Sequence, residues 1–197
     1  MIRRMEAADI GQVVRIHLAS FPGFFLSFLG PQFLALFYAG VCRARTGIAF
    51  VFLDDQDQPA GFVAGSADPR GFYTLLLRRD WPRFGWAALP AVIRRPAVAL
   101  RLLRALRQPS ANPAGDGVAG LFSLGVDPRL QGRGAGRALV KAFLDEARLR
   151  GARRVYLTTD RANNDAVNAF YRKLGFAAER QFATPEGRQM NEYWIDL

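Results

Sequence analysis

One stretch of the sequence, residues 121–137, constrains the fold more than any other. It begins with an apolar run that is typical of a strand, and this run ends at Asp127. Three glycines then follow at alternate positions, before an apolar pattern at helical spacing begins at Ala138. The glycines are Gly132, Gly134 and Gly136. The stretch therefore predicts a strand, a glycine-rich loop and a helix in direct succession.

This order of elements is suited to holding a phosphate group. Glycines let backbone N–H groups approach an anion closely, and the first N–H groups of a helix have no partner within the helix. Arg133 and Arg137 add charged donors to the same loop. The sequence has no Gly-Lys-Ser/Thr of a P-loop, and alternating glycines do not match the dinucleotide pattern G-x-G-x-x-G.

Two segments carry a resemblance to a known family. Residues 131–136 read Q-G-R-G-A-G after V-D-P, which resembles the acetyl-CoA loop of the GNAT superfamily of N-acetyltransferases. Residues 164–176 read N-D-A-V-N-A-F-Y-R-K-L-G-F, which is similar to the second cofactor segment of that family. The resemblance is clearest over residues 117–180.

The resemblance implies an α/β (α+β) architecture, the GNAT fold, in a single domain over residues 1–197. We expect a mixed central sheet of about six or seven strands flanked by helices. The apolar patterns place strands at residues 2–5, 47–53, 60–65, 118–126, 153–158, 176–183 and 189–197. They place helices at residues 8–20, 32–43, 136–150 and 164–174. By resemblance, the fifth strand runs parallel to the fourth.

The segment at about 68–116 is an extra helical insertion between the third and fourth strands. Helical patterns cover residues 71–79, 81–89 and 97–107, and we expect Pro90 and Pro96 to break the segment into short helices. Residues 68–108 hold nine arginines against two aspartates. Three interpretations stay open: a helical cover on the domain, a basic lid for an anionic acceptor, or a surface that contacts an anionic membrane.

The resemblance also implies roles for particular residues. Backbone groups of Leu124, Gly125 and Val126 would bond the pantetheine arm of acetyl-CoA, and Asn164 would contact the arm from the other side. The pyrophosphate would be held by the loop, namely Gln131, Gly132, Arg133, Gly134, Ala135, Gly136 and Arg137. Tyr171 would protonate the departing thiolate, although a tyrosine here could also be a core residue with a satisfied hydroxyl.

The general base does not follow from the sequence. Many relatives carry a glutamate on the fourth strand, but residues 118–126 offer only the hydroxyl of Ser123. A chain of waters, Asp54 or Asp160 could serve instead. His17 is the only histidine, and its helical position favours packing or capping. The aromatic residues of 21–28 could line an acceptor pocket or belong to the core.

Composition limits the setting of the protein. The formal net charge is +10, and Cys42 is the only cysteine, so no intrachain disulfide can form. The N-terminus lacks the apolar run of a secretion signal, and no uncharged apolar stretch of about 18 residues is present. We expect a cytoplasmic protein without a metal, and a homodimer is compatible with the sequence. Nucleic-acid binding is disfavoured because no aromatic residues interleave with the arginines on a strand platform.

Together these features predict an N-acetyltransferase that moves an acetyl group from acetyl-CoA to a primary amine. The acceptor is expected to be a small molecule such as an amino sugar. One alternative is an enzyme that acetylates a protein or peptide amine. Another is a non-catalytic acyl-CoA-binding sensor, because the fourth strand lacks a carboxylate.

Overall fold

A seven-stranded sheet runs through the molecule in the order β1-β2-β3-β4-β5-β7-β6. The computed structural model describes residues 1–96, 115–130 and 132–197. The strands are β1 (Ile2–Arg4), β2 (Gly47–Leu53), β3 (Pro59–Ser66), β4 (Val118–Val126), β5 (Arg154–Asp160), β6 (Ala177–Ala183) and β7 (Gln189–Asp196). The β4–β5 pair is parallel and the other pairs are antiparallel, so the sheet is mixed as expected.

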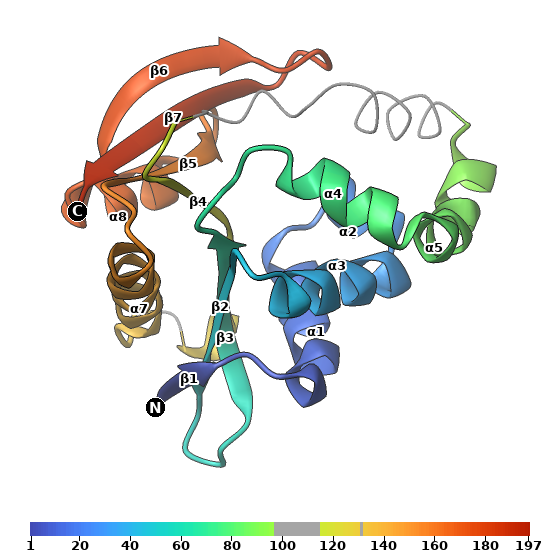
Figure 1. The fold of residues 1–197 in the computed structure, drawn as a ribbon, viewed down its shortest axis with the longest axis horizontal. Coiled ribbons are helices and arrows are strands. Elements are labelled where there is room, and N and C mark those ends of the chain that lie inside the picture. The colour runs from blue at the N-terminus through green and yellow to red at the C-terminus, as the bar shows by residue number, and fades with distance from the viewer. Residues whose placement is uncertain (97–114, 131) are drawn as a thin grey trace.

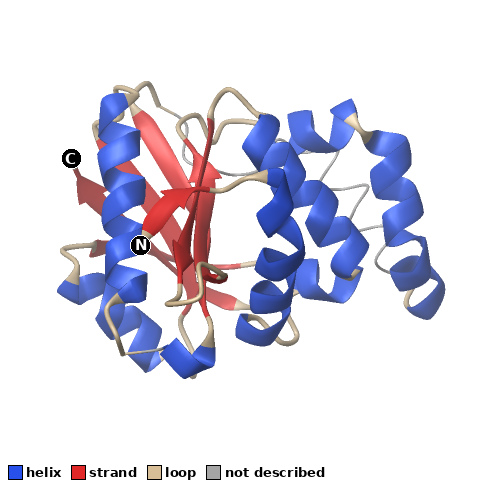
Figure 2. Ribbon diagram, turned by 90° about the horizontal axis from the view of Figure 1, so that it is seen from below, coloured by secondary structure: helices blue, strands red, loops and turns tan. Residues whose placement is uncertain are grey.

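Helices cover both faces of the sheet (Figure 2). One face carries α1 (Ile10–Ser20), α2 (Phe25–Leu29) and α3 (Pro31–Arg43), with α4 (Phe72–Arg79) and α5 (Trp81–Arg94) following in the insertion. The other face carries α7 (Ala135–Leu149) and α8 (Asp165–Lys173). Short 3-10 helices span Ala7–Asp9 and Pro128–Leu130. No helix of the described residues is long and apolar enough to cross a membrane.

The hydrophobic core consists of two clusters separated by the sheet. Val13 of α1 and Phe37 of α3 belong to the cluster on the first face, with Phe62 of β3. Phe143 of α7 and Tyr171 of α8 belong to the cluster on the second face. Helices α1, α3 and α7 each contribute one apolar stripe at a spacing of three and four residues, which is the pattern that the sequence showed.

The insertion forms an additional helical layer outside α2 and α3 (Figure 1). Phe84 of α5 packs against Phe33 of α3, with ring centroids 4.9 Å apart. The position of the insertion between β3 and β4 confirms the sequence prediction. The prediction that Pro90 ends a helix was wrong, because α5 continues through Pro90 to Arg94. Pro90 lies on the exposed side of α5, where its ring meets solvent. The amphipathic stretch 97–107 lies outside the described residues.

Candidate active site

Strands β4 and β5 pair over three positions and then separate. The last of these positions joins Gly120 to Tyr156. Beyond it, β4 continues to Val126 with β3 as its strand neighbour in the described part of the chain (Figure 1). Backbone groups that point from this half of β4 towards β5 have no strand partner there, so a ligand can bond them. The predicted Leu124, Gly125 and Val126 lie on this unpaired half.

A β-bulge accompanies the separation. Ser123 lies opposite Ala64 and Leu121 lies opposite Gly65, so Phe122 is an extra residue in β4. An extra residue bends a strand and increases its twist, which turns the end of β4 away from β5. Gly65 permits the close strand contact beside the bulge, because a Cβ there would lie 2.1 Å from the carbonyl oxygen of Gly120.

The loop after β4 is held in place before the glycines begin. The Asp127 N–H donates to the carbonyl oxygen of Ala60 at 2.8 Å, which joins the loop to the start of β3. Arg129 donates from Nε and Nη2 to the two carboxylate oxygens of Asp127 at 3.0 and 2.7 Å. Hydrogen bonds from the Arg129 side chain and backbone lower the pKa of Asp127 to about 2. The loop therefore leaves β4 in a fixed direction.

The three glycines of the loop meet two different needs. Gly132 and Gly134 have φ angles of +80° and +82°, in the left-handed region that favours glycine. Gly136 lies in the first turn of α7, where a Cβ would come within 3.3 Å of the Phe170 ring on α8. The first two glycines thus shape the turn, and the third allows α7 and α8 to approach each other.

The N-terminus of α7 is suited to an anion. Ala138 makes the first backbone bond of the helix, to the carbonyl oxygen of Gly134 at 3.0 Å. The N–H groups of Ala135, Gly136 and Arg137 therefore have no partner within the helix. The first turn contains no acidic residue, and the side chains of Arg133 and Arg137 are exposed. Gln131 lies outside the described residues.

Helix α8 is anchored to β5 by buried amides. The Asn164 side chain precedes the helix, and its Nδ2 donates to the carbonyl oxygen of Asp160 at 3.1 Å. Asn168 is buried and donates to the same oxygen at 3.1 Å, while its Oδ1 accepts from Thr159 at 2.6 Å. Asn191 of β7 donates to that Oδ1 at 3.3 Å. This network fixes the helix that carries Tyr171.

Tyr171 is buried on α8. Its ring contacts Phe176 and Tyr193 at centroid distances of 5.6 and 6.4 Å. Burial raises the pKa of Tyr171, so the hydroxyl keeps its proton at neutral pH. The structure therefore gives Tyr171 core contacts, and its predicted role as an acid stays a prediction.

On the opposite face of the sheet, a hydrogen-bonded chain joins α1, α3 and β4. The Nδ1 of His17 lies 2.6 Å from the Tyr38 hydroxyl, which also shares a hydrogen bond with Ser123. Burial lowers the pKa of His17 to about 4, so the imidazole is neutral at pH 7. His17 is a buried packing residue, as its position suggested. His17, Tyr38 and Ser123 therefore lie together on this face, beside the bulge.

A buried carboxylate lies on the same face, on β7. The Nε1 of Trp194 donates to Oε1 of Glu192 at 2.9 Å, and the Trp194 ring contacts Tyr156. Tyr156 and Phe122 flank Gly120, which places this group beside the point where β4 leaves β5. Only 6% of Glu192 is exposed, and within the described ranges it forms no salt bridge with an arginine or lysine.

A buried carboxylate without an ion pair is costly, and here the hydrogen bond from Trp194 offsets part of that cost. The Tyr156 hydroxyl is also buried, and it has no hydrogen-bond partner among the described residues. Glu192 was not among the predicted bases, because the resemblance indicated a carboxylate on β4 and not on β7. The signal was present in the alternation of 189–196, which places Glu192 on one strand face with Trp194.

The two carboxylates that the sequence suggested as bases are engaged elsewhere. Asp54 accepts the N–H groups of Gln56 and Gln58 at 2.9 Å within the exposed β2–β3 turn. Asp160 accepts two hydrogen bonds from Nη2 of Arg188, at 2.7 and 2.6 Å. Glu192, in contrast, is buried and forms no salt bridge within the described residues.

Arg188 connects two segments at this end of the sheet. Besides binding Asp160, its guanidinium lies 4.5 Å from the centre of the Phe24 ring. The residue before β7 therefore touches the connection between α1 and α2. Phe24 is the aromatic residue of 21–28 that makes this contact, whereas Phe21, Phe25 and Phe28 pack against the core.

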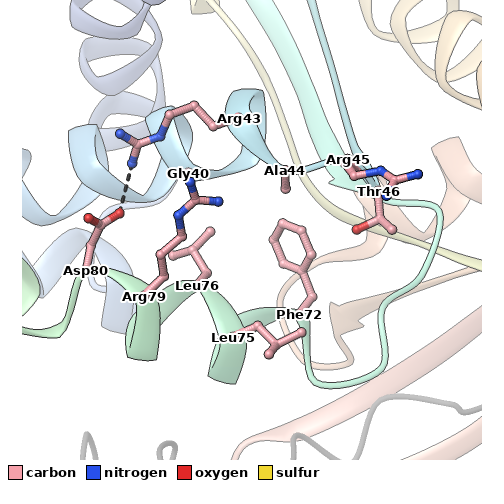
Figure 3. Close-up of a pocket in the computed structure, with 10 residues that line it drawn as sticks. All are labelled: Gly40, Arg43, Ala44, Arg45, Thr46, Phe72, Leu75, Leu76, Arg79 and Asp80. Carbon is pink, nitrogen blue, oxygen red and sulfur yellow. Dashed lines mark hydrogen bonds and ion pairs between the residues drawn. The ribbon is translucent and has the colours of Figure 1, made fainter.

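A pocket of about 230 Å³ lies elsewhere, between α3 and α4 (Figure 3). Its walls include Phe72 and Leu76, with Arg79 and the Arg43–Asp80 ion pair at 3.0 Å. None of the sequence-predicted site residues lines it. No group of three or more metal-ligating side chains occurs in the described part of the chain.

Comparisons with known proteins identify the family of this chain. The profile of the acetyltransferase (GNAT) family matches residues 12–176. The [ribosomal protein bS18]-alanine N-acetyltransferase of Escherichia coli K12 is 39% identical over 75 residues, which cover 36% of this chain and 50% of that protein. The mycothiol acetyltransferase of Cellulomonas flavigena is 37% identical over 110 residues, which cover 56% of this chain and 27% of that protein. The chain thus spans half or less of the length of these curated relatives.

Solved structures share the fold. The ribosomal-protein-alanine N-acetyltransferase of Brucella melitensis has a TM-score of 0.66 at 15% identity, covering 100% of this chain and 99% of that one. Aminoglycoside 6'-acetyltransferase type Ii has a TM-score of 0.65 at 15% identity, covering 100% and 96%. The family match covers most of the sequence, and the separation of β4 from β5, the glycine loop and α7 occur within it. The chain therefore belongs to the GNAT acetyltransferase family.

Proposed function

We propose that this protein transfers an acetyl group from acetyl-CoA to a primary amine. The observation that carries the proposal is the unpaired half of β4, which leads directly into the N-terminus of α7. An extended arm with amide groups can bond such a strand edge, and a pyrophosphate can bind the helix N-terminus that follows. Acetyl-CoA carries both features.

The residues present fit this cosubstrate. Leu124, Gly125 and Val126 would bond the pantetheine arm through their backbone groups. The N–H groups of residues 132–137 and the two exposed arginines would hold the pyrophosphate, because left-handed glycines and a first turn without acids leave that side unobstructed. Asn164 would contact the arm from α8. A contribution from Gln131 stays a prediction.

The reaction needs a proton acceptor and a proton donor. An alkylammonium group has a pKa near about 10, so it must lose a proton before it can attack a thioester. We name the face of the sheet that carries Ser123, Tyr156 and Glu192 the acceptor face. Glu192 is suited to accept that proton, because its carboxylate is buried on this face and forms no salt bridge with a cation of the described residues. Tyr171 is suited to donate a proton to the departing sulfur from the other face. Acetyl-CoA supplies the activated acetyl group.

For the acceptor, we propose a small amine such as an amino sugar. The contacts of Arg188 with Phe24 and Asp160 connect the two segments that border the acceptor face at one end. Such a connection favours a compact acceptor over an extended polypeptide. Ser123, Tyr156 and Glu192 offer polar groups that a molecule with several hydroxyls could bond.

A peptide amine is the second candidate. Matched relatives are named for acetylating the alanine of a ribosomal protein, and an N-alpha-acetyltransferase of Mycobacterium tuberculosis is 50% identical over 56 residues. That match covers 28% of this chain and 33% of that protein. It lies in a short part of the sequence, so it supports the chemistry of transfer more than the choice of acceptor.

The test is an assay of free thiol release from acetyl-CoA with a panel of acceptors. The panel contains simple amines, amino sugars, peptides with N-terminal alanine, and the same peptides with an acetylated N-terminus. Release with amino sugars supports the proposal, and release with the free peptides alone assigns the second candidate. Calorimetry of CoA binding accompanies the assay. Tight binding without release by any acceptor would indicate a sensor, and no binding at all would contradict the cosubstrate site.

A further inference from the structure

Helix α5 has two apolar faces. Phe84, Ala87, Ala88 and Ala91 recur at a spacing of three and four residues, and they are buried. Trp86, Leu89 and Ile93 recur at the same spacing on the opposite side, and we name these three residues the outer face of α5. Trp86 is 76% exposed and Ile93 is 72% exposed. A helix that is apolar all round normally has both sides covered.

The exposed apolar side chains of the protein gather in this region. Leu75 of α4 is 68% exposed and Trp81 at the start of α5 is 66% exposed. Among the described residues, the other large exposed hydrophobic side chains are Met1, Leu149 and Val167, which are separated from one another in sequence and structure. Scattered apolar side chains are normal on a surface, whereas a group on one helix pair indicates an interaction site.

Basic residues border the outer face of α5. Arg83 lies three positions before Trp86, and Arg94 lies eleven positions after Arg83, on the same stripe of the helix. Over residues 72–96 the sequence has five arginines and one acid, Asp80, which pairs with Arg43.

The position of α5 makes this face accessible to a large partner. The helix forms the outer edge of the helical layer, away from the sheet (Figures 1 and 2). It also lies apart from α7 and β7 (Figure 1). Contact through α5 therefore leaves the β4–β5 region free.

We propose that the outer face of α5 docks the protein onto an anionic membrane surface. Tryptophan is favoured at the level of lipid headgroups, because its ring is apolar and its N–H can be hydrogen-bonded. Leu89 and Ile93 enter the boundary of the acyl chains, and the bordering arginines pair with lipid phosphates. The charge of the membrane determines how strongly the protein binds, since a neutral bilayer interacts only with the apolar side chains of the outer face.

Vesicle flotation with the full chain tests the proposal. We expect binding to vesicles of phosphatidylglycerol and phosphatidylcholine at least about 10-fold stronger than to phosphatidylcholine alone, and weaker in high salt. The emission of Trp81 and Trp86 shifts to the blue on binding. The double variant Trp86→Ser/Ile93→Ser loses at least about 10-fold in vesicle affinity. Leu149→Ser, an exposed apolar residue of α7, is the matched control and binds as the parent does.

Removing the charges of the arginines that border the outer face of α5 tests their role. Arg83→Gln/Arg94→Gln reduces binding to anionic vesicles, while Arg148→Gln near the end of α7 leaves it unchanged. Equal binding of parent and double variant to anionic vesicles overturns the proposal. The proposal is also overturned if the parent protein binds no vesicles but forms a dimer in solution that Trp86→Ser/Ile93→Ser abolishes. In that case the outer face of α5 contacts a second copy of the protein. Thiol release in solution is the same for all these variants.

Discussion

The two sides of the sheet, at the point where β4 leaves β5, are constructed in different ways. The side that we propose binds the cofactor comes from one continuous stretch, in which β4, the glycine loop and the start of α7 follow one another. We call it the cofactor side and the opposite one the acceptor side. The acceptor side is assembled from separate elements: His17 of α1, Tyr38 of α3, Ser123 of β4, Tyr156 of β5 and Glu192 of β7. Backbone groups dominate the first side, and side chains dominate the second.

The difference shows which part of the chemistry each side can supply. Backbone N–H groups and exposed arginines hold a fixed anion, and they need little besides the correct turn. Proton transfer requires side chains that can accept or donate a proton, and backbone groups alone do not supply them. The neutral His17 and the buried Glu192 both lie on the acceptor side. Variants on the two sides should therefore separate binding from turnover.

The largest effect is expected for Glu192→Gln. Loss of the proton acceptor should lower kcat by about 10³-fold, or about 4 kcal/mol of activation free energy, because the ammonium acceptor cannot attack. The Kd of acetyl-CoA should stay within about 2-fold of the parent value, since this side chain lies on the acceptor face. Glu179→Gln on the neighbouring strand β6, where the side chain is exposed, is the control. An unchanged kcat in Glu192→Gln would assign the base elsewhere.

The second prediction concerns His17 and pH. Its pKa is lowered to about 4 by burial, so only the unfolded state binds a proton between that value and the ordinary value of 6.5. Stability is fully present above about pH 6.5 and falls as the pH decreases towards 4, by about 1.4 kcal/mol per unit and about 3 kcal/mol in all.

Urea unfolding between pH 7.5 and 4.5 measures this dependence. His17→Gln should be less stable at pH 7, because it disturbs the hydrogen bond to Tyr38, but its stability should depend less steeply on pH. Carboxylates contribute to the slope of both proteins, so the difference between the slopes is the relevant quantity. Equal slopes would mean that His17 titrates normally in the folded protein.

A smaller effect is expected for Tyr171→Phe. A thiolate leaves without much assistance because the pKa of a thiol is near about 8.5, so we expect kcat to fall by about 10²-fold, the low end for general acids. Affinity for acetyl-CoA should be retained. Tyr193→Phe is a close control, because it removes a neighbouring buried hydroxyl that has no hydrogen-bond partner in the described structure. Equal loss in both variants would indicate a packing role for Tyr171.

The smallest effect is expected for Gly134→Ala. A side chain at a φ of +82° costs about 1–2 kcal/mol of conformational free energy. We expect the strained loop to bind acetyl-CoA with a Kd about 10-fold higher, while kcat at saturation stays almost unchanged. Gly151→Ala is matched in strain, with a φ of +83° at the other end of α7. Both variants should lose stability, but only Gly134→Ala should lose affinity in calorimetry. Unchanged affinity would remove the loop from the cosubstrate site.

Local patterns were sufficient to predict most of the fold. The apolar alternation of 47–53 and the helical spacing of 136–150 identified β2 and α7 because each pattern depends only on neighbouring residues. Pro90 misled the prediction, since a proline inside a helix is tolerated where its ring faces solvent. The bulge at Phe122 was missed because it depends on the register with Gly65, a distant residue.

Local patterns in the sequence were enough to predict the elements of the proposed cofactor side. The positive φ angles at Gly132 and Gly134, and the start of α7 directly after them, are local properties, so adjacent residues are enough to specify them. The proposed acceptor side, in contrast, depends on how distant elements pack together. Glu192 and Tyr156 stand 36 positions apart in the printed sequence, and His17 is more distant still. Their burial and their contacts arise from strand pairing and helix packing, which bring together residues that no local pattern connects.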